Sequence, residues 1–155
     1  MAISASKPAT APQIDDTTLR GFIGYTMKRA YMVVRNDMHR VLAEHDLRVT
    51  TFSALCIIAE NSDLTQTQLA GALKIERSSV VVVVDELEGR ELISRNRVEG
   101  DRRTYALRIT LKGRRLFERI VEEAKQHENA LLSDLSDAER ETLFGLLKRV
   151  ENSAS

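Results

Sequence analysis

Apolar residues recur every three or four positions in two stretches near the start of the chain, which is the spacing of amphipathic helices. The first stretch runs from Asp16 to about Glu44 and predicts one long helix. The second is TFSALCIIAE, in which Thr50 stands where a helix N-cap is expected. Residues 1–14 have no apolar pattern and are rich in Ala, Ser, Thr and Pro, so they are predicted to form a disordered tail. We expect residues 15–155 to form a single domain.

Two capping boxes mark where further helices begin. In LTQTQL, Thr65 and Gln68 have the T-x-x-Q spacing that lets each side chain bond to the backbone N–H of the other. This motif predicts a short helix over residues 66–72. The S-x-x-E motif that starts at Ser136 has the same spacing and predicts a last helix that ends at about Val150.

Five consecutive valines stand in the stretch SSVVVVVDELEGREL, and β-branched residues favour strands. No turn residue separates these valines from the helix-forming DELEG, however, so a strand has no place to end. A helix over residues 77–89 instead puts four apolar side chains on one stripe: Val80, Val83, Val84 and Leu87. The pattern therefore predicts a helix from which Val81 and Val82 face outward, unless the packing places that pair in the core.

A β-hairpin is predicted after this helix. Residues 92–97 and 104–109 are both strand-like, and the Glu-Gly-Asp between them is a turn signal. Thr110 then caps a long helix over residues 111–132. The expected order is four helices, a hairpin and two helices, which is a mainly α (α+β) fold.

Charge changes this picture only locally. Lys plus Arg and Asp plus Glu both total 23, so the whole chain is not a polycation that coats nucleic acid or membrane. From Ser94 to Arg115, however, eight basic residues stand against two acidic ones, a net of +6. This basic segment covers the hairpin and the start of the next helix. It is either a nucleic-acid contact or an ordinary solvated face.

Cys56 is the only cysteine, which rules out an intramolecular disulfide and a zinc site built on several cysteines. A single cysteine is typical of a reducing compartment, and no apolar run approaches the roughly 18 residues of a membrane span, so we expect a cytoplasmic protein. Cys56 stands on the apolar face of the second helix. It is interpreted as a core residue, and the alternative is a redox-sensing thiol.

The sequence offers no pattern for catalysis. His39, His45 and His127 are too far apart in the sequence for a metal motif, and no nucleophile, base and orienting group cluster together. We therefore expect no enzyme activity, no metal and no cofactor.

Three motifs carry a resemblance to a known family: LTQTQLAGAL, ERSSVVVVVDELEGRELISR and GDRRTYALRITLKG. From about Leu19 to Val150 the chain resembles the MarR (multiple antibiotic resistance regulator) family of bacterial transcription factors. The resemblance implies a winged helix-turn-helix with a two-stranded β wing in a DNA-binding lobe at about residues 50–112. It also implies long N- and C-terminal dimerisation helices at 15–48 and 111–151, and a homodimer that a small molecule releases from a pseudo-palindromic operator.

A recognition helix reads the major groove with its N-terminal residues, where Arg can bind guanine and Val can pack on thymine methyl groups. The resemblance further implies that Asp101 orients the wing, that Arg103 enters the minor groove and that Arg97 and Arg102 contact phosphates. The sequence departs from the family by placing Glu91 where many members have Gly. The expected DNA-binding residues are Thr65, Gln66, Arg77, Ser78, Ser79, Val81, Val82, Arg95, Arg97, Asp101, Arg102 and Arg103.

The family resemblance implies effectors that are aromatic carboxylates, phenols or aromatic acyl-CoA thioesters, bound between the dimerisation helices and the DNA-binding lobe. The first helix offers ring-stacking and anion-binding groups for such a ligand. The expected effector-binding residues are Tyr25, Lys28, Arg29, Tyr31, Arg35 and His39. The alternatives to a ligand-responsive repressor are a helical interaction or scaffold protein, and a regulator that senses redox state through Cys56.

Overall fold

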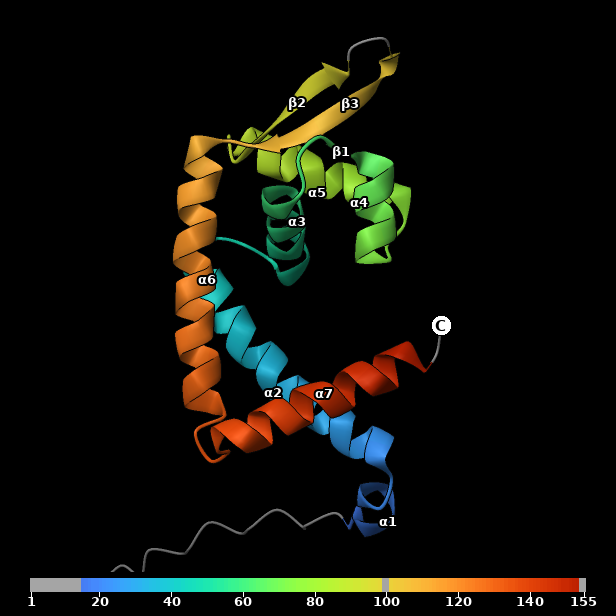
Figure 1. The fold of residues 1–155 in the computed structure, drawn as a ribbon, viewed down its shortest axis with the longest axis vertical. Coiled ribbons are helices and arrows are strands. Elements are labelled where there is room, and N and C mark those ends of the chain that lie inside the picture. Colours follow the sequence, from blue (N-terminus) through green and yellow to red (C-terminus); the bar gives the residue numbers. More distant parts are fainter. Residues whose placement is uncertain (1–14, 99–100, 154–155) are drawn as a thin grey trace, which may run out of the picture. The chain divides into compact units, whose positions relative to one another are not determined.

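The structure is a computed structural model, and it describes residues 15–98 and 101–153 (Figure 1). Helices dominate it, and a small sheet follows the fifth helix, so the predicted mainly α architecture is confirmed. The elements in chain order are α1 (Thr17–Arg20), α2 (Ile23–Ala43), α3 (Val49–Glu60), β1 (Leu64–Thr65), α4 (Gln66–Leu73), α5 (Arg77–Gly89), β2 (Ile93–Val98), β3 (Asp101–Ile109), α6 (Leu111–Leu131) and α7 (Asp137–Asn152).

The prediction of one unbroken first helix is wrong. The chain turns at Gly21 and Phe22, between α1 and α2. Glycine is a poor helix former, and here the backbone N–H of Gly21 bonds to the carbonyls of both Thr17 and Thr18 as the short helix closes. The contacts between residues also group the chain into two compact units, and the boundary between them lies within α2, between Val33 and Val34. No helix of the described residues is both long enough and apolar enough to cross a membrane.

Helices α3, α4 and α5 form the helix-turn-helix. The capping box of Thr65 and Gln68 is present and starts α4 where the sequence predicts. The helix α3 begins one residue before the expected cap: Arg48 is its N-cap, and Thr50 lies inside the helix. Lys74 closes α4 in the left-handed conformation, at a φ of 52°, which lets the chain turn sharply into α5.

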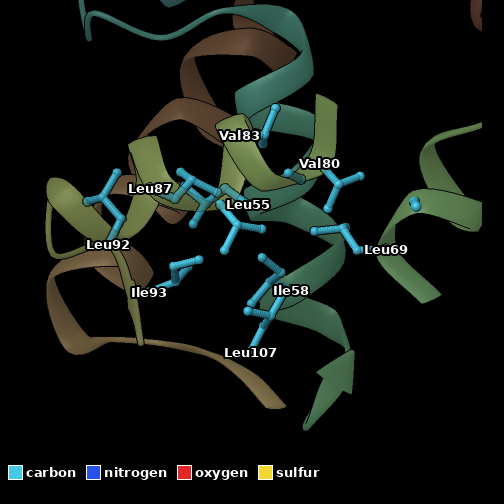
Figure 2. Packing of buried hydrophobic residues seen from close by; sticks show 12 residues of the cluster. Leu55, Ile58, Leu69, Val80, Val83, Leu87, Leu92, Ile93 and Leu107 are labelled. Atoms are coloured by element: carbon cyan, nitrogen blue, oxygen red, sulfur yellow. The ribbon is translucent and has the colours of Figure 1, made fainter. Parts of the chain in front are cut away.

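The valine-rich segment is a helix with the bounds that the sequence predicts, Arg77–Gly89. Its apolar stripe is buried, and it packs on Leu55 and Ile58 of α3 and on Leu69 of α4 (Figure 2). Leu92, Ile93 and Leu107 of the sheet side complete the same cluster. The core therefore locks the recognition helix to the other helices of the motif and to the base of the hairpin.

The hairpin is part of a sheet with one more strand than expected. The strands stand in the order β1-β3-β2, and all neighbours are antiparallel. The short β1 pairs Leu64 with Leu107 and Thr65 with Ala106, so the start of α4 is bonded to the wing. Two residues are too few for a periodicity signal, which is why the sequence does not reveal this strand.

Helix α6 begins against the turn that follows α5. Thr110 caps it, as predicted, by accepting a bond from the backbone N–H of Gly113 at 3.0 Å. Gly113 lies so close to this turn that a Cβ atom would come within 2.0 Å of the carbonyl oxygen of Leu92. Further along α6, Ile120 packs with Leu42 and Leu47 in a second, smaller core cluster. Glycine at 113 is thus required for this close approach.

Replacing Gly113 with Ala should lower the free energy of unfolding by about 1–3 kcal/mol, because the added methyl group overlaps a backbone carbonyl that cannot move freely. The matched control is Gly71→Ala in α4, where a Cβ would meet nothing within 4 Å. That change should be neutral or stabilising, because alanine is the better helix former. Denaturant unfolding of both variants measures the difference, and equal stabilities would contradict the close approach.

Candidate nucleic-acid interface and ligand cavity

The exposed face of α5 begins at its N-terminus. Arg77, Ser78 and Ser79 are exposed there, and one turn later Val81 and Val82 are 44% and 58% exposed. The prediction that this valine pair faces outward is confirmed, and its placement in the core is excluded. A pair of large apolar side chains exposed on a helix is costly unless a partner covers them.

Thr65 and Gln66, the expected DNA contacts at the start of α4, differ in their bonds within the protein. The hydroxyl of Thr65 accepts a bond from the backbone N–H of Gln68 at 3.2 Å and donates to its side-chain oxygen at 2.9 Å. Gln66 follows it in the first turn and is half-buried. Arg77, the first residue of α5, donates to the hydroxyl of the next residue, Thr67, at 2.5 Å, which holds the arginine beside the N-terminus of α4.

Arg95 of β2 joins the wing to the recognition helix. Its guanidinium donates to Glu88 at 2.6 Å and to Asp85, and its backbone N–H donates to Glu88 at 3.3 Å. Asp85 lies one turn beyond Val81 on α5, and its side chain is 58% exposed. Arg95 therefore neutralises a carboxylate that would otherwise repel phosphates next to the exposed valines.

The remaining predicted wing residues divide into two groups. Arg97 is exposed, and its backbone pairs with Tyr105 in the hairpin register. The side chains of Asp101, Arg102 and Arg103 lie outside the described residues, so their expected roles stay predictions. On the central strand, Arg108 donates to Asp63 at 2.5 Å and ties β3 to the turn before β1. That bond raises the pKa of Arg108, which remains charged at any physiological pH.

A cavity of about 210 Å³ lies between α2, α3 and α6. Its apolar wall consists of side chains from all three helices, and its polar rim comes from α2 and α6. The lining residues are Val34, Asp37, Met38, Val41, Phe52, Cys56, Val121, Ala124, Lys125, His127, Glu128 and Leu131. The volume suits one substituted aromatic ring, since an engineered apolar cavity of about 150 Å³ holds benzene.

Asp37 is the buried polar group of this cavity, with only 8% of its surface exposed. One carboxylate oxygen accepts a bond from Arg40 at 2.8 Å, and the other lies 3.5 Å from Nδ1 of His127. Only His127 lines the cavity, and no hydrogen bond joins it to the second oxygen, which therefore keeps acceptor capacity. A ligand with a hydroxyl or amide donor would satisfy it.

The predicted effector residues do not line this cavity. Arg35 and His39 are exposed on α2 and lie on neither of its walls. Tyr25 and Arg29 belong to the separate unit of residues 15–33, where Tyr25 donates to Asp16 at 3.1 Å and Arg29 lies 3.5 Å from the same carboxylate. Lys28 and Tyr31 belong to that unit as well, and Tyr31 is exposed. The amphipathic pattern of the sequence shows which face of α2 is apolar. It does not show how α3 and α6 pack against α2, and that packing forms the cavity.

The environment of Cys56 argues against the redox alternative. Burial raises the pKa of this thiol to about 11, and the nearby carboxylate of Glu60 adds to the rise. Since the thiolate is the form that oxidants attack, and a raised pKa leaves only about one thiol in ten thousand ionised at pH 7, Cys56 is a poor sensor. Its side chain forms part of the cavity wall instead.

A helix-turn-helix whose recognition helix is followed by an antiparallel hairpin defines a winged-helix DNA-binding protein. Comparisons with known proteins agree with that class. The MarR family profile matches residues 47–105. Over 147 residues the chain is 33% identical to a Thauera aromatica protein named for transcriptional regulation of the hcr operon, and the match covers 93% of this chain and 89% of that protein. The chain belongs to the MarR family.

Solved structures of the transcriptional repressor CouR have the same fold. One is bound to a 23-mer DNA duplex; it is 33% identical, with a TM-score of 0.83 over 90% of this chain and 99% of that one. Another is bound to p-coumaroyl-CoA; it is 31% identical, with a TM-score of 0.78 over 90% and 98% of the two chains. The protein is thus a transcriptional regulator of a non-enzymatic family, which confirms the sequence-based identification.

Proposed function

We propose that the protein is a homodimeric repressor that binds a pseudo-palindromic operator and is released by a small aromatic ligand. The observation that carries the proposal is the exposed face of α5 described above. Arg77, Ser78 and Ser79 open that face, Val81 and Val82 follow, and Arg95 beside it cancels the charge of nearby carboxylates. A helix with this face fits the major groove, where arginine reads guanine and valine packs on thymine methyl groups.

The wing supplies the second contact in this proposal. Arg97 is exposed on β2, and the Asp-Arg-Arg sequence at 101–103 follows at the tip. We assign Arg103 to the minor groove, Arg97 and Arg102 to phosphates, and Asp101 to orienting the wing, in keeping with the family resemblance. A narrow minor groove concentrates negative potential and attracts such an arginine. Arg95, also an expected DNA contact, orients the wing through its ion pairs with Asp85 and Glu88. We assign Thr65 and Gln66, at the start of α4, to the DNA backbone.

Dimerisation is proposed for the apolar face of α7. Five large apolar side chains of this helix are exposed in one chain: Leu143, Phe144, Leu146, Leu147 and Val150. An exposed patch of this kind marks an interaction surface. A second copy is the occupant that the function requires, because a two-fold dimer presents two recognition helices to half-sites one DNA turn apart. In the domain organisation that we propose, residues 50–112 read DNA and the flanking helices join the two chains.

The effector site is proposed for the cavity of about 210 Å³ between α2, α3 and α6. Its size and apolar wall favour a single aromatic ring, and Asp37 favours a phenolic hydroxyl or another donor. The solved CouR complex with p-coumaroyl-CoA makes aromatic thioesters a reasonable class to test. Because the cavity touches both α3 of the DNA-binding lobe and α6, a ligand there can change how the two are held.

Replacing Arg77 with Ala should relax base preference in the major-groove part of the half-site by about 1–3 kcal/mol, if the arginine holds a guanine by two bonds. The measurement is binding of the variant to a panel of operator base substitutions at fixed salt. Arg35→Ala, which removes the same charge from exposed α2, is the control and should keep the base preference. Weakening that is uniform across the panel, together with a smaller salt dependence, would instead assign Arg77 to a phosphate.

Replacing Phe144, which is 61% exposed, with Glu should produce monomers, because the change buries a charge at the proposed dimer surface. Loss of the dimer should also lower the affinity for the operator, because a monomer brings only one recognition helix to the DNA. Thr142→Glu adds the same charge to the same helix at a polar position and should remain dimeric. Sedimentation and operator titration follow both variants; a dimeric, tightly binding Phe144→Glu protein would refute this surface.

Filling the cavity should abolish the response to effector without affecting operator binding. Ala124→Leu adds three carbons to the cavity wall, and Ala130→Leu adds them at an exposed position of the same helix as the control. A thermal-shift screen of phenols, aromatic acids and aromatic acyl-CoA thioesters first identifies a ligand, which at a hundred times its Kd adds about 2.7 kcal/mol of stability. The Ala124→Leu variant should lose this shift and stay on the operator. A full response in that variant would rule out this cavity.

A further inference from the structure

The turn between α2 and α3, residues 44–48, is bonded to two helices that lie far from it in the sequence. It leaves the end of α2 beside α6 and leads into α3 (Figure 1). Asp46 within the turn has a φ of 53°, a left-handed conformation that is uncommon for a residue with a side chain. A backbone of this kind persists where the surrounding contacts hold it. The contacts that hold this turn come from α5 and from α6.

The recognition helix holds the turn from its C-terminal end. Arg90, the C-cap of α5, donates to the carbonyl oxygens of His45 at 2.9 Å and Asp46 at 2.7 Å. One turn earlier on α5, Glu86 forms an ion pair with Arg48, the last residue of the turn. The donors of a guanidinium lie in one plane and in a fixed fork. By bonding to two successive carbonyls, Arg90 therefore sets the direction of the turn relative to the axis of α5.

Helix α6 holds the same turn from the other side. Nε2 of His45 bonds to the carboxylate of Glu123 at 2.5 Å, and the side chain of His45 is only 12% exposed. Leu47 of the turn packs with Ile120, one turn earlier on α6, in the smaller core cluster. Apolar contacts have no directional preference, whereas a hydrogen bond prefers a particular distance and angle. The bond between His45 and Glu123 therefore fixes the direction of α6 where the apolar contact alone would let it tilt.

Two attachments along α6 determine its angle to α5. The first is the close approach of Gly113 to the carbonyl of Leu92, and the second is the bond at Glu123, about 15 Å further along the helix. Beyond Glu123, α6 runs to Leu131 and leads to α7, the helix that we assign to the dimer. A tilt of about 10° would move the far end of a helix of about 30 Å by about 5 Å, which exceeds the roughly 3.4 Å between base pairs. Release of the second attachment is thus large enough to change how a dimer fits two half-sites.

We propose that Arg90 and His45 are positioning residues for operator reading. Through the turn, they set the angle between α5 and α6, and thereby the separation of half-sites that the dimer accepts. Neither residue contacts DNA in this proposal, because Arg90 closes the end of α5 opposite to Arg77 and His45 faces α6. The inference rests on the homodimer and the operator proposed above, and it assigns the selectivity for one separation to particular side chains.

The test measures affinity as a function of half-site separation, with the full chain and an operator that the wild type selects from random duplexes. Duplexes with one or two base pairs inserted or removed at the centre are compared with the parent operator. The wild type should bind the altered duplexes at least tenfold more weakly. Arg90→Gln and His45→Leu should each lower this ratio at least threefold while they remain dimeric in sedimentation. The double variant should lower it no further than the stronger single variant, because both changes release the same turn.

Three control variants separate orientation from charge and stability. His45→Gln keeps a donor toward Glu123 and should keep the wild-type ratio. Arg35→Gln removes an exposed charge of α2, and Ile58→Val removes a buried methylene of α3 away from the turn, so both should also keep the ratio.

An unchanged ratio in both Arg90→Gln and His45→Leu, even with weaker binding to every duplex, would overturn the inference. A wild-type dimer that binds all separations equally would also overturn it, and would leave the proposed function intact. A wild type that is monomeric or binds no duplex would overturn the proposed function together with the inference.

Discussion

The burial of one face of α5 is the interaction on which the rest of the structure depends. Val80, Val83, Val84 and Leu87 lie on this face, and each contributes about 1.5–3 kcal/mol by leaving water. Because these side chains pack on α3, on α4 and on the base of the sheet at once, they fix the recognition helix against every element around it. The opposite face, with Val81 and Val82, is thereby turned to solvent. The same run of valines thus supplies both the core and the exposed surface, with helical periodicity deciding which side each one takes.

Electrostatic contacts then adjust what the core has placed. Arg95 joins β2 to two carboxylates of α5, and Arg108 joins β3 to Asp63 before β1. Both strands of the wing are therefore attached to the helix-turn-helix. Exposed pairs of this kind contribute little stability, since water screens them. Their larger effect is on orientation: they limit how the hairpin leans relative to the recognition helix. For the reading of two grooves that we propose, this angle matters more than a fraction of a kcal/mol.

Local signals in the sequence predict local features well. The capping boxes at Thr65 and Ser136 start α4 and α7 as expected. The helix predicted from the apolar stripe of the valine-rich segment has the bounds that α5 has in the structure. Errors arise where tertiary contacts override propensity. Thr50 is a good N-cap by composition, yet α3 begins earlier because Val49 packs on the second core cluster. The residues that line the cavity proposed for the effector come from three helices, so no single stretch of sequence reveals them.

The turn between α5 and β2 shows how backbone constraints set the position of a site. Glu91 adopts a φ of 61°, a conformation that costs a residue with a side chain about 1–2 kcal/mol and that glycine adopts freely. The departure from the family at this position is therefore a real structural cost. The turn nevertheless directs the carbonyl of Leu92 toward the start of α6, where it accepts a bond from the backbone N–H of Thr110 at 3.0 Å. Gly113 then passes directly over that carbonyl, which only a residue without a Cβ can do. With α6 held this close, Arg115 and Arg119 are brought next to Arg90. The cluster of Arg90, Arg115 and Arg119 thus follows from the backbone at two positions, Glu91 and Gly113.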